Sequence, residues 1–158
     1  MSKSHHGFTL IEALIIVGVL GILLAMATLV LRPDRTAVNQ AARGLSANVT
    51  RARLEAIKSN TYAGLSVNTS QKSYTVWVDT DGNGLFTSGT DRVVQQVTLG
   101  QGELARVTLG TGTTLTGIVF DSRGIPQNQG GGNVVFTDLG NSYSKTVIVN
   151  AQGRARVQ

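Results

Sequence analysis

The chain contains no cysteine, and its only two histidines, His5 and His6, lie at the extreme N terminus. The absence of cysteine excludes disulfide bonds, thiolate nucleophiles and cysteine-containing zinc sites. Because histidine is confined to the N terminus, a histidine-based catalytic triad in the body of the chain is excluded as well. The composition therefore favours a structural or binding protein over an enzyme.

Acidic and aromatic residues are also scarce. The chain has 9 Asp and Glu against 14 Lys and Arg, a formal net charge of +5, and only 5% aromatic residues. A basic surface attracts phosphates and anionic headgroups, whereas few aromatic rings leave little for stacking on bases. A nucleic-acid partner would therefore be held mainly through its phosphates.

A long apolar run lies near the N terminus, from Phe8 to Leu31, and its one charged residue is Glu12. As a helix this run is about 36 Å long, which is enough to cross a bilayer core of roughly 30 Å. The natural cleavage position is at Gly7, before the run, so the hydrophobic segment would stay on the mature protein. A lone carboxylate in such a segment is costly and is therefore a functional candidate.

The sequence from Gly7 to Glu12, Gly-Phe-Thr-Leu-Ile-Glu, resembles the N-terminal signal of type IV pilins and pseudopilins. The resemblance implies that a prepilin peptidase removes residues 1–7 as a leader, cutting between Gly7 and Phe8, and that Phe8 is N-methylated. It also implies that Glu12 pairs with the free amino terminus of a neighbouring subunit, because a carboxylate in hydrocarbon needs a cation or stays protonated. The alternatives are a plain membrane anchor and a Glu12 that only reaches the membrane interface.

The resemblance further implies where the protein resides. Residues 8–31 would form a transmembrane and assembly helix in the bacterial inner membrane, single-pass with the C-terminal domain extracytoplasmic. The subunit would then enter a pilus or pseudopilus filament. Its partners would be other pilins or pseudopilins, through the N-terminal helix, and the prepilin peptidase. Once the leader is removed, the mature chain keeps no histidine.

Residues 32–60 are predicted to form a second, amphipathic helix that begins or kinks at Pro33. Its apolar arc is expected to pack on a sheet and consists of Ala37, Val38, Ala41, Ala42, Leu45, Val49, Ala52, Leu54 and Ala56. Its basic arc consists of Arg32, Arg35, Arg43, Arg51, Arg53 and Lys58. A basic arc is usually a solvated face; contact with acidic headgroups, nucleic acid or an adjoining subunit is the alternative.

From residue 61 onward the pattern changes to short, partly alternating β-branched segments separated by Gly-, Asn- and Ser-rich turns. The predicted strands are residues 62–67, 73–78, 92–99, 105–109, 113–120, 133–136, 143–149 and 154–157. Short strands at this spacing form antiparallel sheets. The predicted fold class is therefore α+β and pilin-like, in which residues 32–60 and the β-rich region 61–158 form one globular domain.

The C-terminal half resembles the GspH/FimT family of minor pseudopilins and minor pilins. The resemblance is carried by a phenylalanine strand and glycine turn, Gly117–Gly124, a second strand, Gly132–Phe136, and a terminal strand pair, Thr146–Val157. It implies a structural subunit of a type II secretion pseudopilus or a type IV pilus, at or near the filament tip. A secretion subunit would present a surface to exported proteins.

The segment Gly153-Arg154-Ala155-Arg156 matches a G-R-x-R motif. In FimT-type members such a tail is associated with DNA binding during DNA uptake in natural transformation. On a strand, Arg154 and Arg156 would project from one face and hold phosphates, and Lys145 or Arg123 could enlarge the patch. The alternative is a turn that simply closes the terminal hairpin.

The segment Asp79-Thr-Asp81-Gly-Asn83-Gly has the opening of a calcium-binding loop. However, the twelfth position is Thr90, where such a loop has a bidentate glutamate, and Asp91 follows one residue later. A tight turn between strands is therefore favoured. No cofactor is expected, and Asp79, Asp81 and Asn83 remain weak calcium candidates.

Overall fold

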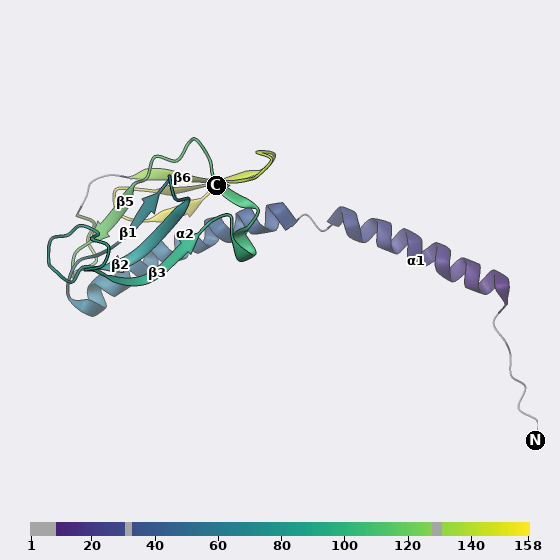
Figure 1. The fold of residues 1–158 in the computed structure, drawn as a ribbon, viewed down its shortest axis with the longest axis horizontal. Helices are drawn as coiled ribbons and strands as arrows, with labels where there is room; N and C mark the ends of the chain where they lie inside the picture. Colours follow the sequence, from purple (N-terminus) through teal and green to yellow (C-terminus); the bar gives the residue numbers. More distant parts are fainter. Residues whose placement is uncertain (1–8, 31–32, 128–130) are drawn as a thin grey trace, which may run out of the picture. The chain divides into compact units, whose positions relative to one another are not determined.

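The computed structural model describes residues 9–30, 33–127 and 131–158 (Figure 1). These residues fall into two compact units, one up to Pro33 and one from Asp34 to Gln158. The predicted leader and the predicted cleavage site at Gly7 and Phe8 lie outside the described residues.

The N-terminal unit is the helix α1, Leu10–Val30, which contains 21 residues. Thr9 caps it, because the Thr9 hydroxyl oxygen accepts a hydrogen bond from the Glu12 amide at 3.3 Å. The apolar side chains from Leu10 to Leu24 are exposed within this unit. Among the described residues, no helix has both the length and the hydropathy of a membrane span.

The next helix is α2, Pro33–Ser59, which has 27 residues and belongs to the second unit from Asp34 onward. Proline is favoured at a first helical position, where its missing N–H would have no intrahelical partner. The buried apolar residues of α2 recur mostly every three or four positions and are Ala37, Val38, Ala41, Ala42, Leu45, Val49, Ala52 and Ala56. The predicted amphipathic helix is thereby confirmed.

The prediction that Leu54 belongs to the buried apolar arc is wrong. Its side chain is 59% exposed. Residue 54 lies two positions from both Ala52 and Ala56, a rotation of about 200°, and therefore points away from the face that they bury. Ile57, which breaks the apolar pattern, is exposed as well.

The chain then forms two four-stranded antiparallel sheets, which confirms the α+β fold (Figure 1). The first sheet has the strand order β3-β2-β1-β5, with bounds Arg92–Thr98, Ser73–Val78, Ala63–Asn68 and Gly117–Phe120. The second sheet has the order β4-β6-β7-β8, with bounds Val107–Leu109, Gly132–Asp138, Ser144–Val149 and Ala155–Val157. A short 3-10 helix, Gly102–Leu104, precedes β4.

Both sheets and α2 contribute to one hydrophobic core. In the first sheet, Leu65 pairs with Val76 and Ile118, and all three side chains are buried. In the second sheet, Val134 pairs with Val147, and both are buried. Because every buried core residue lies between Ala37 and Val149, the unit from Asp34 to Gln158 has a complete core without α1. We therefore expect residues 34–158 to fold alone.

Two leucines of α2 test this packing. Leu45→Ala should lower the free energy of unfolding of residues 34–158 by about 2–5 kcal/mol, because it opens a cavity in the core. Leu54→Ala should change it by only about 0.5 kcal/mol or less, because Leu54 faces solvent. Urea denaturation followed by circular dichroism measures both values. Similar losses for the two variants would contradict the placement of α2.

Candidate functional site

Glu12 lies in the first turn of α1. Its backbone amide donates to both the hydroxyl and the carbonyl oxygen of Thr9. Its side chain is exposed within its unit, and its carboxylate has no partner among the residues that the structure describes. Glu12 is therefore available to a cation supplied from outside its own unit.

The terminal hairpin, formed by β7 and β8, is closed by a tight turn over residues 150–153. The Asn150 side-chain oxygen accepts hydrogen bonds from the amides of Gln152, at 3.2 Å, and Arg154, at 2.8 Å. The Gly153 amide donates to the Asn150 carbonyl at 2.9 Å, and Gly153 has a φ of +70°. This left-handed conformation favours glycine.

Gly153 also contacts the core directly. A Cβ atom built on Gly153 would lie 2.5 Å from Cε1 of Phe120 and 3.0 Å from Nη2 of Arg53. The Arg53 guanidinium lies 4.9 Å above the Phe120 ring and donates a hydrogen bond to the Gln152 carbonyl. The phenylalanine strand and the Gly-Arg turn, which are distant in the sequence, therefore form a single packed unit that Arg53 of α2 holds together.

Sequence reasoning placed Arg53 on the solvated basic arc and did not assign this role. The one available signal is its position on the helical wheel. Arg53 lies at the edge of the basic arc, about 60° from Ala56 and about 100° from Ala52, where a long side chain can lie along the sheet.

Arg154 and Arg156 are exposed on the outer face of the second sheet. The register pairs Ala155 with buried Val149, so Ala155 is on the core side. Because side chains alternate along a strand, Arg154 and Arg156 lie together on the opposite face. Neither forms an ion pair within the described part of the chain. Their guanidinium groups are free to hold phosphates.

The other two candidate cations do not join them. Lys145 pairs with Phe136, which is fully buried, and directly opposed residues share a face. Lys145 therefore lies on the core side of the second sheet, away from the arginines. Arg123 forms an ion pair of 3.0 Å with Asp121 in the loop after β5. The phosphate-binding candidate is thus the pair Arg154 and Arg156.

The loop between β2 and β3 brings three carboxylates together, because oxygens of Asp79, Asp81 and Asp91 lie within 4.8 Å of one another. Asp79 accepts hydrogen bonds from the amides of Asp81, Gly82 and Gly84 at 3.1, 2.7 and 2.6 Å.

The remaining groups of the loop are also bonded to one another. Asp91 accepts from the amides of Thr80 and Thr87 at 3.0 and 2.6 Å. Asn83 donates from its side chain to Asp81 at 2.8 Å and accepts from the Leu85 amide. The weak calcium candidates therefore hold the turn through the backbone, and the tight turn stays the favoured interpretation.

The hydrogen bonds at Asp79 set its acidity. Burial raises the pKa of Asp79, but the amides of Gly84, Gly82 and Asp81 outweigh this effect and bring the pKa below its ordinary value of 3.8. The pKa of Asp121 is lowered mainly by the Ile125 amide, and that of Asp138 mainly by the Ser142 hydroxyl. The ionised forms of all three therefore stabilise the fold. This stability is present above the ordinary pKa and is lost as pH falls through the lowered pKa values.

We expect the free energy of unfolding of residues 34–158 to decrease as the pH falls below about 4, where these carboxylates become protonated. Asp79→Asn should lower it by about 1–3 kcal/mol at pH 7, because both carboxylate oxygens of Asp79 accept from backbone amides and asparagine has only one oxygen, and it should flatten the acid dependence. Urea denaturation at several pH values measures both effects. An unfolding midpoint that rises on addition of calcium would contradict the tight-turn interpretation.

Comparison with known proteins gives two matches to family sequence profiles. The family described as type II transport protein GspH matches residues 41–153, and the prokaryotic N-terminal methylation motif matches residues 2–28. The pilin-like protein PilA1 of Thermus thermophilus is 39% identical over 159 residues, which cover 98% of this chain and 99% of that protein.

Solved structures share the fold. The type IV minor pilin FimU of Pseudomonas aeruginosa superposes with a TM-score of 0.57 at 14% identity, covering 78% of this chain and 90% of FimU. The minor pseudopilin EpsH from the type 2 secretion system of Vibrio cholerae superposes with a TM-score of 0.55 at 18% identity, covering 77% of this chain and 95% of EpsH. The chain therefore belongs to the GspH/FimT family of pilin-like proteins and carries the family's N-terminal methylation motif.

Proposed function

We propose that this protein is a minor subunit at or near the tip of a type IV pilus or a type II secretion pseudopilus, stored in the inner membrane before assembly. The observation that carries this proposal is Glu12, which stands without a partner in the described residues, in the first turn of an apolar helix directly behind the predicted cleavage site. A methylation motif followed by such a helix supports assembly of this chain into a filament.

The apolar surface of α1 supports a role as a helix that other molecules cover. Its side chains from Leu10 to Leu24 are exposed within its unit, and exposed apolar surface costs about 25 cal/mol per Å² in water. A Cβ atom added to Gly18 or Gly21 would meet no atom within 4 Å. Small residues on an open helix surface allow another helix to approach closely. Lipid before assembly and neighbouring helices afterwards would cover this surface.

Glu12 supplies the electrostatic reason for assembly. Cleavage after Gly7 creates a new amino terminus at Phe8, and an ammonium group and a carboxylate are both costly in hydrocarbon. Pairing the amino terminus of one subunit with Glu12 of another neutralises both charges. The prepilin peptidase would therefore act before assembly, because only the cleaved chain has this amino group.

The same features support a structural and binding role without catalysis. The mature chain would have neither histidine nor cysteine. The clustered carboxylates Asp79 and Asp91 are occupied by backbone amides. No residue set with the geometry of a nucleophile and its base stands out among the described residues.

Replacing Glu12 separates membrane storage from assembly. Glu12→Ala should still be cleaved and methylated at Phe8, but its incorporation into filaments should fall about tenfold or more, because breaking a buried charge pair costs about 3–5 kcal/mol. Intact-mass spectrometry measures processing, and immunoblots of sheared filaments measure incorporation. Gly7→Ala is the matched control and should stay at full length. An uncleaved Met1 terminus in filaments would overturn the proposal.

A second candidate function is DNA binding for uptake in natural transformation. It is favoured by the exposed positions of Arg154 and Arg156 on one face of the second sheet, with no ion-pair partner in the described regions. Arg53, Phe120 and Gly153 fix the turn from which these two side chains extend. Arginine contacts to phosphate carry no base information, so binding would be independent of sequence.

Salt dependence tests this second function. Duplex DNA should bind residues 34–158 with a log–log salt slope near −2, since each neutralised phosphate contributes roughly −0.9. Arg154→Gln with Arg156→Gln should weaken binding to all sequences alike and leave the fold intact. Lys145→Gln, on the core side, and Arg106→Gln, in an ion pair with Asp34, are matched controls that should bind like the parent. If the double variant binds DNA as tightly as the parent, the tail is only a structural turn. A surface for exported proteins is then favoured as the function.

A further inference from the structure

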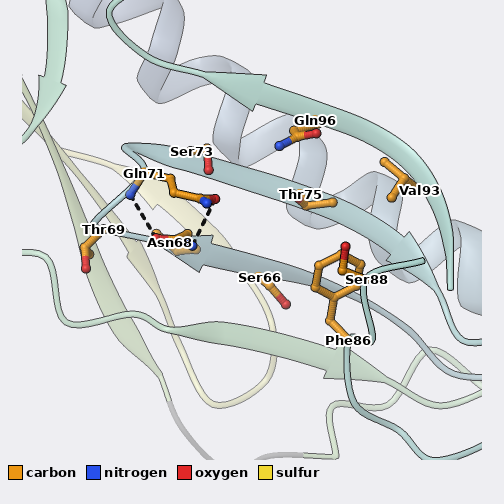
Figure 2. A pocket seen from close by; sticks show the side chains of 11 residues that line it. Ser66, Asn68, Thr69, Gln71, Ser73, Thr75, Phe86, Ser88, Val93 and Gln96 are labelled. Carbon is orange, nitrogen blue, oxygen red and sulfur yellow. Dashed lines mark hydrogen bonds between the residues drawn. The ribbon is translucent and has the colours of Figure 1, made fainter. Parts of the chain in front are cut away.

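The outer face of the first sheet carries a groove with a volume of about 540 Å³ (Figure 2). It lies between the β1–β2 turn and the β2–β3 loop, on the side of the sheet away from the core. We infer that this groove is a binding site for a neutral oligosaccharide.

The floor of the groove is a row of polar side chains that crosses three strands. The register places Thr75 of β2 opposite Gln96 of β3 on one side and opposite Ser66 of β1 on the other. Figure 2 shows the three side chains on the same face. Ser73 lies two residues before Thr75 on that face, and both residues are buried.

The hydroxyl groups of Ser73 and Thr75 are unused by the protein. Within residues 9–30, 33–127 and 131–158, neither hydroxyl forms a hydrogen bond to another group of the protein. Both line the groove, so a ligand seated there would reach them. Neither oxygen is among the fully buried polar atoms without a partner, so water reaches both hydroxyls in the open groove, and the hydroxyl groups of a ligand can replace that water.

The two ends of the groove are held in place. At one end, Asn68 and Gln71 hydrogen-bond to each other through their side chains at 3.1 Å, and Asn68 also accepts from the Gln71 amide at 2.9 Å. At the other end, the half-buried Phe86 ring packs at 5.7 Å from the ring of buried Trp77. Trp77 in turn donates to the Ser66 hydroxyl at 2.9 Å. The groove is therefore formed before any ligand binds.

The lining excludes several ligand classes. None of its residues carries a formal charge, so nothing in it would compensate a phosphate or a carboxylate. Its floor strands, β1 and β2, are interior strands of the sheet, and their backbone groups are already paired on both sides. An extended peptide therefore cannot add as a strand over β1 or β2, and the one edge strand of the floor is β3.

The lining matches a polyhydroxyl ligand. Serine and threonine hydroxyls and the amides of asparagine and glutamine each donate and accept hydrogen bonds, as sugar hydroxyls do. The Phe86 ring offers an apolar surface at one end, against which the C–H face of a sugar ring can pack. A few convergent polar groups beside an aromatic ring are the elements of a small-molecule site.

The experiment is an NMR titration of ¹⁵N-labelled residues 34–158 with cellohexaose, chitohexaose and maltohexaose. We expect at least one to shift the amides of Ser66, Thr75 and Gln96, with a dissociation constant of about 1 mM or below. Thr75→Val, which keeps shape but removes the hydroxyl, should weaken binding about three- to tenfold. Thr146→Val, on the outer face of the second sheet, is the matched control and should bind like the parent.

Gln96→Glu, at an exposed position on edge strand β3, introduces a charge without opening the core and should also weaken binding. No shift with any of the three oligosaccharides at about 10 mM would overturn the inference. Unchanged affinity in both Thr75→Val and Gln96→Glu would overturn it too. Binding of polygalacturonate as tightly as the neutral oligosaccharides would also overturn the inference, because the groove has no cation for its carboxylates.

Discussion

The packing of α2 against two sheets is the interaction on which the folded unit depends. Five of the eight buried apolar residues of α2 are alanines, and such small side chains let the helix backbone approach closely. Leu45, Val38 and Val49 belong to the same buried cluster as residues of both sheets. Each sheet can then present only its other face to the surroundings. The arginine pair and the uncharged groove therefore lie on different sheets, so a polyanion on one need not compete with a neutral ligand on the other.

The helices, the strands and the order of elements could be predicted from the sequence, because hydrophobic periodicity is a local property. The tertiary environment of individual side chains could not be predicted in this way. Leu54 is apolar and yet faces solvent, since its angular position and not its polarity decides its environment. Lys145 is separated from Arg154 and Arg156 by strand alternation, which depends on a register that the sequence does not state.

Arg53 shows a second limit of local reasoning. A long cationic side chain beside an apolar arc is indistinguishable in sequence from other surface arginines. Arg53 gains the Phe120 ring and the Gln152 carbonyl as partners only because the chain returns to it twice, 67 and 99 residues later. The groove on the first sheet was missed for a similar reason, because its floor residues become neighbours only through the pairing of three strands.

The contact between Gly153 and Phe120 makes the order of chain synthesis matter. Phe120, at the end of β5, is fully buried, and part of its cover comes from a turn only a few residues from the C terminus. Arg53 gains its hydrogen bond from the same turn. The cover of Phe120 therefore depends on contacts that are distant in sequence, and such contacts are slow to form. A chain that stops before residue 153 would lack this cover of Phe120 as well as Arg154 and Arg156, so the packing at Phe120 and the arginine pair are completed together.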